Sequence, residues 1–155
     1  MNVLKLQNDL LKKAYNRDYN YKKDDTGVYS VCEYECTNYL AYSDKHAVYM
    51  IPEFLLYIDI NKIFPGEPTK ALDRIINNSK DVNLVEVLDT DTIKMQDKSK
   101  LHIFKIDDEE IYVDEKLLKY FDFKNDISFF GAGKKSPIYV FEQDILMGLV
   151  LPTIL

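Results

Sequence analysis

The sequence predicts an α+β fold: a single domain with a mainly antiparallel sheet and about three helices. Three observations carry this prediction. Short segments rich in β-branched and aromatic residues recur along the chain, polar turns separate many of them as in hairpins, and three other segments have the apolar spacing of helices. The chain has 155 residues, a length that suits one hydrophobic core. We therefore expect one domain that spans residues 1–155.

Three segments are predicted to be helical. Residues 2–16 carry apolar residues at helical spacing, and residues 68–77 carry a proline near the first turn, where proline is tolerated. A third, short helix is expected at residues 115–121, because the Asp114 carboxylate suits an N-cap. The apolar residues of the first helix are Val3, Leu6, Leu10, Leu11 and Ala14.

The predicted strands alternate with turns over the rest of the chain. The last third, from Leu101 to Leu155, has the clearest pattern, because two apolar runs meet there at an acidic turn and a hairpin follows at the end. Residues 54–64 fit either a buried strand or a helix. The predicted strands cover residues 28–35, 38–42, 47–51, 81–88, 92–95, 127–130, 138–141 and 145–151.

The two cysteines predict ordinary reduced thiols. Cys32 and Cys36 lie four residues apart, which in a strand places them about 13 Å apart, too far for a disulfide. A zinc site needs two more ligands, and neither His46 nor His102 stands at a ligand-like spacing. We expect no metal and no cofactor.

Hydropathy predicts a cytoplasmic protein with no membrane segment. No apolar run approaches the ~20 residues of a membrane span. Polar residues such as Lys5 and Asp9 also interrupt the amino-terminal stretch, where a signal peptide would be continuously apolar.

Charge is distributed unevenly along the chain. Residues 1–23 contain six lysine and arginine residues against two aspartates, so this segment carries +4, while the net charge of −6 leaves −10 for the remainder. The first helix is expected to turn its cationic residues to one side, where they meet phosphates. The alternative is a solvated helix face without a ligand. The predicted DNA contacts are Lys5, Lys12, Lys13 and Arg17.

Tyrosine is in excess, with 12 copies. Tyr15, Tyr19 and Tyr21, beside Lys22 and Lys23, have the composition of a platform on which single-stranded nucleic acid stacks. The alternative is structural, because tyrosine is a good strand former and supplies bulk at half-buried positions.

No motif predicts catalysis. The acidic clusters, such as residues 107–110, fall in predicted turns, where solvated carboxylates are ordinary. Residues 131–136 read Gly-Ala-Gly-Lys-Lys-Ser and resemble part of a phosphate-binding loop, but they precede a predicted strand rather than a helix. We therefore assign no catalytic residue and expect a protein that is not an enzyme.

The order of elements in the last third resembles the last domain of a bacterial sliding clamp, the ring-shaped processivity factor of DNA polymerase. That family ends in a strand and a short tail with a proline, a basic residue and a leucine. Here the tail is Leu151-Pro152-Thr153-Ile154-Leu155, and Ile154 stands near the place of the basic residue. The resemblance implies a clamp-like domain, partner binding at Pro152 and Leu155, and a homo-oligomer, since the family's rings contain six such domains.

Two functions are consistent with these observations. The first is a non-enzymatic DNA-associated or replication-accessory protein that contacts phosphates through its first helix. The second is an anti-defence protein that inhibits a host nucleic-acid-processing enzyme, with an acidic surface that mimics DNA. The composition, rich in Lys, Asn, Asp and Tyr and without Trp, resembles phage-encoded or mobile-element proteins of low-GC Gram-positive bacteria.

Overall fold

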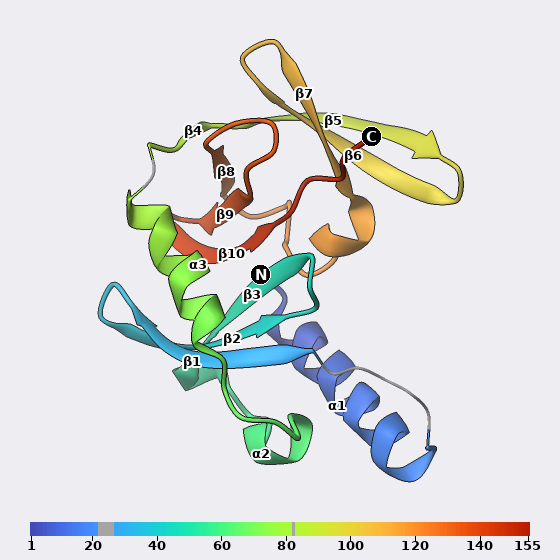
Figure 1. Cartoon of the computed structure of the whole chain (residues 1–155), viewed down its shortest axis with the longest axis vertical. Coiled ribbons are helices and arrows are strands. Elements are labelled where there is room, and N and C mark those ends of the chain that lie inside the picture. Colours follow the sequence, from blue (N-terminus) through green and yellow to red (C-terminus); the bar gives the residue numbers. More distant parts are fainter. Residues whose placement is uncertain (22–26, 82) are drawn as a thin grey trace. The chain divides into compact units, whose positions relative to one another are not determined.

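A computed structural model describes residues 1–21, 27–81 and 83–155 (Figure 1). These residues form two compact units, an N-terminal unit of residues Asn2–Asn77 and a C-terminal unit of residues Asn78–Leu155 together with Met1. Strands pair antiparallel in both units, and the described residues contain three α-helices. The predicted α+β class is confirmed, and the expected one-domain organisation stays a prediction.

The N-terminal unit contains a three-stranded antiparallel sheet in the order β1-β2-β3. Val28 pairs with Ser43 between the first two strands, and Tyr39 pairs with Pro52 between the second and third. The elements are α1 (Val3–Tyr19), β1 (Val28–Tyr34), β2 (Thr37–Ser43), β3 (Ala47–Pro52), the 3-10 turn η1 (Glu53–Leu55), α2 (Ile60–Ile63) and α3 (Lys70–Asp81), which continues past the boundary of the unit.

α1 begins at a side-chain cap and buries one stripe. The Asn2 side chain accepts a hydrogen bond from the Lys5 backbone N–H at 3.0 Å, which satisfies one of the free amides of the first turn. Its buried residues are Leu6, Gln7, Leu10 and Ala14. The predicted helix is confirmed and extends beyond residue 16.

Gln7 is a polar residue inside the buried stripe of α1, and the segment that follows η1 satisfies it. Its Nε2 donates to the Leu55 carbonyl at 3.0 Å, and its Oε1 accepts from the Tyr57 N–H at 2.9 Å. A buried amide is tolerated only when its groups are paired. Gln7 therefore fastens α1 to the chain between η1 and α2.

Both cysteines are free thiols, as predicted, but the β1–β2 turn places Cys36 outside the strand in which it was expected. Glu35 and Cys36 both have positive φ, 48° and 63°, as a two-residue hairpin turn of the primed type requires. Cys36 therefore lies in an exposed turn, while Cys32 is buried in β1. Burial, with the nearby Asp73 carboxylate, raises the pKa of the Cys32 thiol to about 11, so this thiol is neutral at physiological pH.

The strand tyrosines of the N-terminal unit fill its interior. Tyr29 stacks on Phe64 with a centroid distance of 4.6 Å, and Tyr42 lies 6.0 Å from Tyr49. The structural interpretation of tyrosine thus holds for the strands. The buried strand tyrosines are Tyr29, Tyr34, Tyr39, Tyr42 and Tyr49.

The C-terminal unit contains two sets of antiparallel strands. One set has the order β10-β9-β8-β4, and the other forms a three-stranded sheet in the order β5-β6-β7. The elements are β4 (Val85–Glu86), β5 (Leu88–Gln96), β6 (Ser99–Ile106), β7 (Glu109–Asp114), the 3-10 turn η2 (Glu115–Leu118), β8 (Ile127–Gly131), β9 (Ile138–Glu142) and β10 (Ile145–Val150).

An aromatic cluster forms part of the core of this unit. Phe104 and Phe129 lie 4.8 Å apart, and the His102 ring lies 4.7 Å from Phe104. His102 Nε2 contacts Asp89 Oδ1 at 2.5 Å. A β-bulge between Asp89 and Thr92 shifts the register of β5 at this point. The contact with Asp89 thus gives the nearly buried His102 ring a polar partner.

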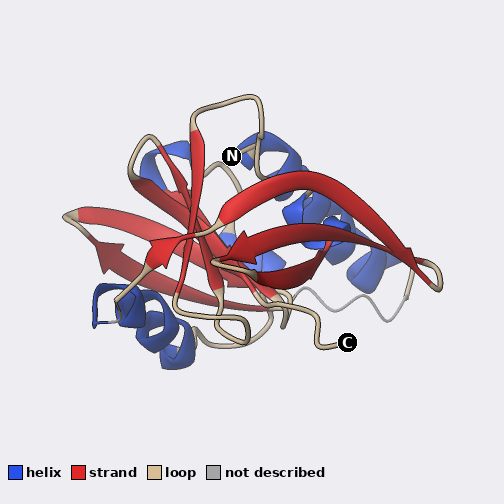
Figure 2. Cartoon of the chain, turned by 90° about the horizontal axis from the view of Figure 1, so that it is seen from above, coloured by secondary structure: helices blue, strands red, loops and turns tan. Residues whose placement is uncertain are grey.

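Two segments differ from the sequence prediction. The helix expected at residues 115–121 is only one 3-10 turn, and residues 81–88 begin inside α3 rather than in a strand. The ambiguous residues 54–64 form η1 and α2, two short helical pieces with extended chain between them. Figure 2 shows strands as the main secondary structure of the chain. The observed element type thus differs from the predicted one at residues 115–121 and at the start of residues 81–88.

Candidate functional site

The four predicted DNA contacts on α1 do not share one side of the helix. Residues in an α-helix follow one another at about 100°, so Lys5 and Lys12 differ by only about 20°. On the same count, Lys13 lies about 100° from Lys12, and Arg17 about 140°. Lys5 and Lys12 are exposed, whereas Lys13 and Arg17 are half-buried. The expectation that Lys13 projects with Lys5 and Lys12 is therefore wrong.

Lys13 and Arg17 are engaged within the N-terminal unit. The Lys13 ammonium donates to the Tyr42 hydroxyl at 3.2 Å and lies 5.9 Å from the centre of that ring. The Arg17 guanidinium donates to the backbone carbonyls of Ile63 at 2.8 Å and Lys62 at 3.2 Å. Arg17 thus ties the last turns of α1 to the C-terminal end of α2.

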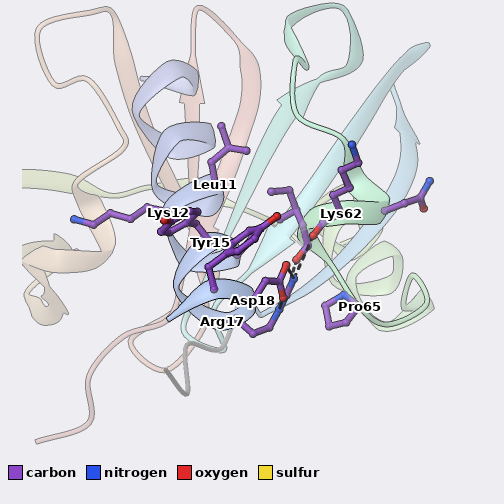
Figure 3. A pocket seen from close by; sticks show the side chains of 11 residues that line it. Leu11, Lys12, Tyr15, Arg17, Asp18, Lys62 and Pro65 are labelled. Carbon is purple, nitrogen blue, oxygen red and sulfur yellow. Dashed lines mark hydrogen bonds and ion pairs between the residues drawn. The ribbon is translucent and has the colours of Figure 1, made fainter. Parts of the chain in front are cut away.

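An open groove of about 900 Å³ lies between α1 and α2 (Figure 3). Its volume lies within the range of small-molecule sites in proteins. The lining is largely apolar and aromatic, with lysines among it. The lining residues are Leu11, Lys12, Ala14, Tyr15, Arg17, Asp18, Tyr19, Asn61, Lys62, Ile63 and Pro65.

Core packing holds the α2 wall of the groove in place. Ile63 is buried, and Phe64, the next residue, stacks on Tyr29 of β1. At the other end of α2, Asp59 caps the helix, since its carboxylate accepts from the Asn61 N–H at 3.1 Å. Core packing therefore holds the backbone of α2 while the Lys62 side chain, 84% exposed, stays in solvent.

The α1 wall presents two tyrosines to solvent. The rings of Tyr15 and Tyr19 stack with their centres 4.9 Å apart, and the residues are 55% and 69% exposed. Leu11, expected in the core, is 42% exposed beside them and lines the groove. Exposed aromatic residues that line a concave surface are typical of a binding site rather than of a core.

The charges around the groove favour an anionic ligand. Arg17 grips Asp18 with two hydrogen bonds, at 2.8 Å and 3.2 Å. These bonds lower the pKa of the Asp18 carboxyl below its ordinary value, so it stays ionised and is neutralised by Arg17. Lys12 has no ion pair within the described ranges, and Lys62 meets only Asp59 at the limiting distance of 4.0 Å.

Figure 3 shows how these groups are arranged. The Lys12 and Lys62 side chains extend to different sides of the view, and Arg17 and Asp18 meet below the Tyr15 ring. The groove thus offers an aromatic surface with a lysine on each wall. Arg17 and Asp18, paired with each other, also line it.

Sequence reasoning missed part of this site. Lys62 and Asn61 come from the segment whose fold was ambiguous, and nothing local marks them as neighbours of α1. Of the predicted tyrosine platform, Tyr15 and Tyr19 line the groove, while Tyr21 is 90% exposed outside it. Lys22 and Lys23 lie outside the described residues. The signal available in the sequence was the spacing of Leu11, Tyr15 and Tyr19 on one side of a helix.

The predicted partner-binding tail packs back on the C-terminal unit. The Thr153 N–H donates a hydrogen bond to the carbonyl of Tyr112 in β7 at 2.7 Å. The tail is thus attached to the backbone of β7. Pro152 is half-buried, while Leu155 is 55% exposed and lines a pocket of about 180 Å³ with Asp114. Partner binding at Pro152 and Leu155 stays a prediction.

The structure also locates the Gly131–Ser136 stretch and bears on the predicted lack of a membrane segment. The Gly131–Ser136 stretch joins β8 to β9, so a strand follows it, as predicted. Lys134 and Lys135 in this loop are exposed. Over the described part of the chain, no helix has the length and apolar character that crossing a membrane requires.

The sliding-clamp resemblance rests on the order of elements in the last third. β8, β9 and β10 follow η2 there, close to the expected positions. This order is common among α+β folds, so the resemblance stays a prediction. In comparisons with known proteins, the chain matches no family model, no curated protein and no solved structure.

Proposed function

We propose that this chain is a non-enzymatic DNA-associated protein of the replication-accessory kind, cytoplasmic, and that its contact surface is the exposed side of α1 together with the groove against α2. One observation carries the proposal: exposed tyrosines and exposed lysines share this surface. Lysine ammonium groups neutralise phosphates, which supplies most of the affinity of sequence-independent binding. The contacts we propose are Lys5, Lys12 and Lys62.

The three lysines are spread over the proposed surface. Lys5 and Lys12 lie about 10 Å apart along the helix axis, and Lys62 stands on the other wall of the groove. Lys13 and Arg17, predicted from the sequence as contacts, act instead as positioning residues, since their polar groups already have partners in the fold.

The proposal is tested by titrating labelled DNA at several salt concentrations. Contact with three phosphates predicts that log affinity falls with log salt at a slope of roughly −2 to −3, and loss of one contact flattens that slope by about one unit. We expect Lys12→Glu and Lys62→Glu to weaken binding. Lys98→Glu, the same charge change at an exposed lysine of the C-terminal unit, is the matched control. Equal effects at all three positions would contradict the proposed surface.

A second candidate function is inhibition of a host nucleic-acid-processing enzyme through an acidic, DNA-like surface. The β5-β6-β7 sheet favours it, because several carboxylates in its turns, in the β5 bulge and at the start of β7 are exposed and make no ion pair with a described residue. Such a surface complements a basic cleft. Absence of DNA binding at low salt favours this function over the first. These carboxylates are Asp91, Asp97, Asp107, Asp108 and Glu109.

If the protein acts as a sliding clamp, it must also form a ring. A ring built from single domains needs several copies of this chain, so light scattering on the purified protein is expected to give a ring-sized mass. If the protein is a monomer and still binds DNA, the ring hypothesis is wrong and the proposed DNA contact stands.

A further inference from the structure

The exposed tyrosine rings of the groove indicate which class of ligand it can bind. Tyr15 and Tyr19 stack on each other, so each ring uses one face within the pair. Both residues are more than half exposed and line the same groove. A planar group that enters the groove therefore meets an aromatic surface that is already ordered, which reduces the entropic cost of binding.

The charges on the two walls select an anionic form of such a planar ligand. Lys12 lies on one wall and Lys62 on the other, and the carboxylate of Asp18 is already paired with Arg17. In a nucleic-acid strand, each planar base lies between two negatively charged phosphates. An acidic peptide can also offer an aromatic ring and negative charges, but it does not carry a negative charge on both sides of every ring.

Double-stranded DNA fits the groove less well than an unpaired strand. In a duplex the faces of the bases are stacked on one another, so only lysine contacts to the outer phosphates remain. Proteins that bind single strands combine aromatic side chains, on which bases stack, with cations that follow the backbone. The α1–α2 groove brings these two elements together.

We infer that the groove between α1 and α2 binds single-stranded nucleic acid, with one base stacked on the Tyr15–Tyr19 pair and the adjacent phosphates held by Lys12 and Lys62. The inference rests on the proposed DNA association and narrows it to unpaired strands. Every base has a flat face, so this mode of binding has little dependence on sequence.

The binding test uses a short labelled oligothymidylate and a duplex with the same number of phosphates. We expect the single strand to bind more tightly. Tyr15→Leu keeps apolar bulk but removes the ring, and it is expected to weaken single-strand binding by roughly 5- to 100-fold, the effect of losing one stacked aromatic ring. Tyr21→Leu, at an exposed tyrosine outside the groove, is the matched control and is expected to leave binding unchanged.

A second readout does not depend on affinity. An oligonucleotide that carries 5-bromouracil forms covalent links on irradiation to aromatic rings that contact the base. Mass spectrometry of the digested complex is expected to find the link on Tyr15 or Tyr19. A link found only on tyrosines elsewhere in the chain would overturn the inference.

The outcomes separate this inference from the proposed function. Equal binding of both DNAs, weakened by Lys12→Glu and unaffected by Tyr15→Leu, overturns the single-strand site and leaves the DNA association intact. Binding of neither DNA overturns both. Tighter binding of an acidic, phenylalanine-containing peptide, lost in Tyr15→Leu, assigns the groove to a protein partner and also overturns the inference.

Discussion

The inner and outer sides of α1 use polar residues in opposite ways. On the inner side, Gln7, Lys13 and Arg17 have hydrogen-bond partners in other segments of the N-terminal unit. On the outer side, Lys12 and Tyr15 face solvent beside the groove. Polar residues of one helix thus divide into a set that is paired within the fold and a set that is exposed to solvent. Position around the helix axis, rather than residue type, makes the difference.

The strongest test of this comparison is at Gln7, the most buried polar residue of α1. Gln7→Leu removes the partners of the Leu55 carbonyl and the Tyr57 N–H, and partly buried backbone groups that lose their partners are costly. We expect the free energy of unfolding to fall by about 2 kcal/mol, measured by urea denaturation.

The matched control for Gln7 is Lys5→Leu on the outer side of the same helix. An exposed position without a structural partner changes stability by no more than about 0.5 kcal/mol. Similar losses in the two variants would show that the two sides of α1 do not differ in the way described.

Arg17 sharpens the comparison because it was predicted as a DNA contact and is found between α1 and α2. Arg17→Met removes hydrogen bonds to two carbonyls and to Asp18, so we expect a loss of about 1 kcal/mol in the free energy of unfolding. DNA affinity is expected to fall as well, because the groove loses the link between its walls.

Lys12→Met is the companion variant, because it should weaken DNA binding and leave stability unchanged. Denaturant unfolding and DNA titration on both proteins therefore separate a positioning residue from a contact. If Arg17→Met weakens binding with no change in unfolding, Arg17 contacts the ligand directly.

The smallest expected effect is the pH dependence of the Arg17–Asp18 pair. Hydrogen bonds from Arg17 hold the pKa of Asp18 below its ordinary value of 3.8. A carboxyl with a lowered pKa in the folded state stabilises the fold above its unfolded pKa, and this contribution is lost as the pH falls through the lower, folded pKa. Since Asp18 is exposed, the contribution is small.

Asp18→Asn provides the measurement. The difference in unfolding free energy between the natural protein and this variant should narrow as the pH is lowered from neutral to below about 4. A difference that stays constant over this range would mean that the pair does not stabilise the fold.

Local patterns predicted the elements whose residues interact mainly with near neighbours in sequence. α1 and the β2–β3 hairpin follow from apolar spacing and turn composition, since these reflect the periods of helix and strand. Residues 54–64 were ambiguous because short apolar runs fit both periods. Their division into η1 and α2 depends on contacts with distant residues, such as those of Gln7 and Arg17.

The groove shows the same limit. Its α1 half was visible in the sequence as tyrosines and lysines on a helix, but Leu11 and Lys13 were each assigned to the wrong side. An apolar face predicted from spacing alone is centred on the apolar residues. In the structure that face is turned away from Leu11 and toward Lys13 and Arg17, whose polar groups find partners within the N-terminal unit.

By itself, the sequence determined the α+β class, the cationic first helix and the strand-rich last third, because these depend on local periodicity, turn chemistry and charge. Only the tertiary structure decided which cations of this helix are exposed and which are engaged within the fold. It also brought Lys62 to the groove from a segment that is distant in sequence. The physical reason is that long-range hydrogen bonds and core packing, such as Phe64 against Tyr29, fix the surface, and no local pattern encodes them.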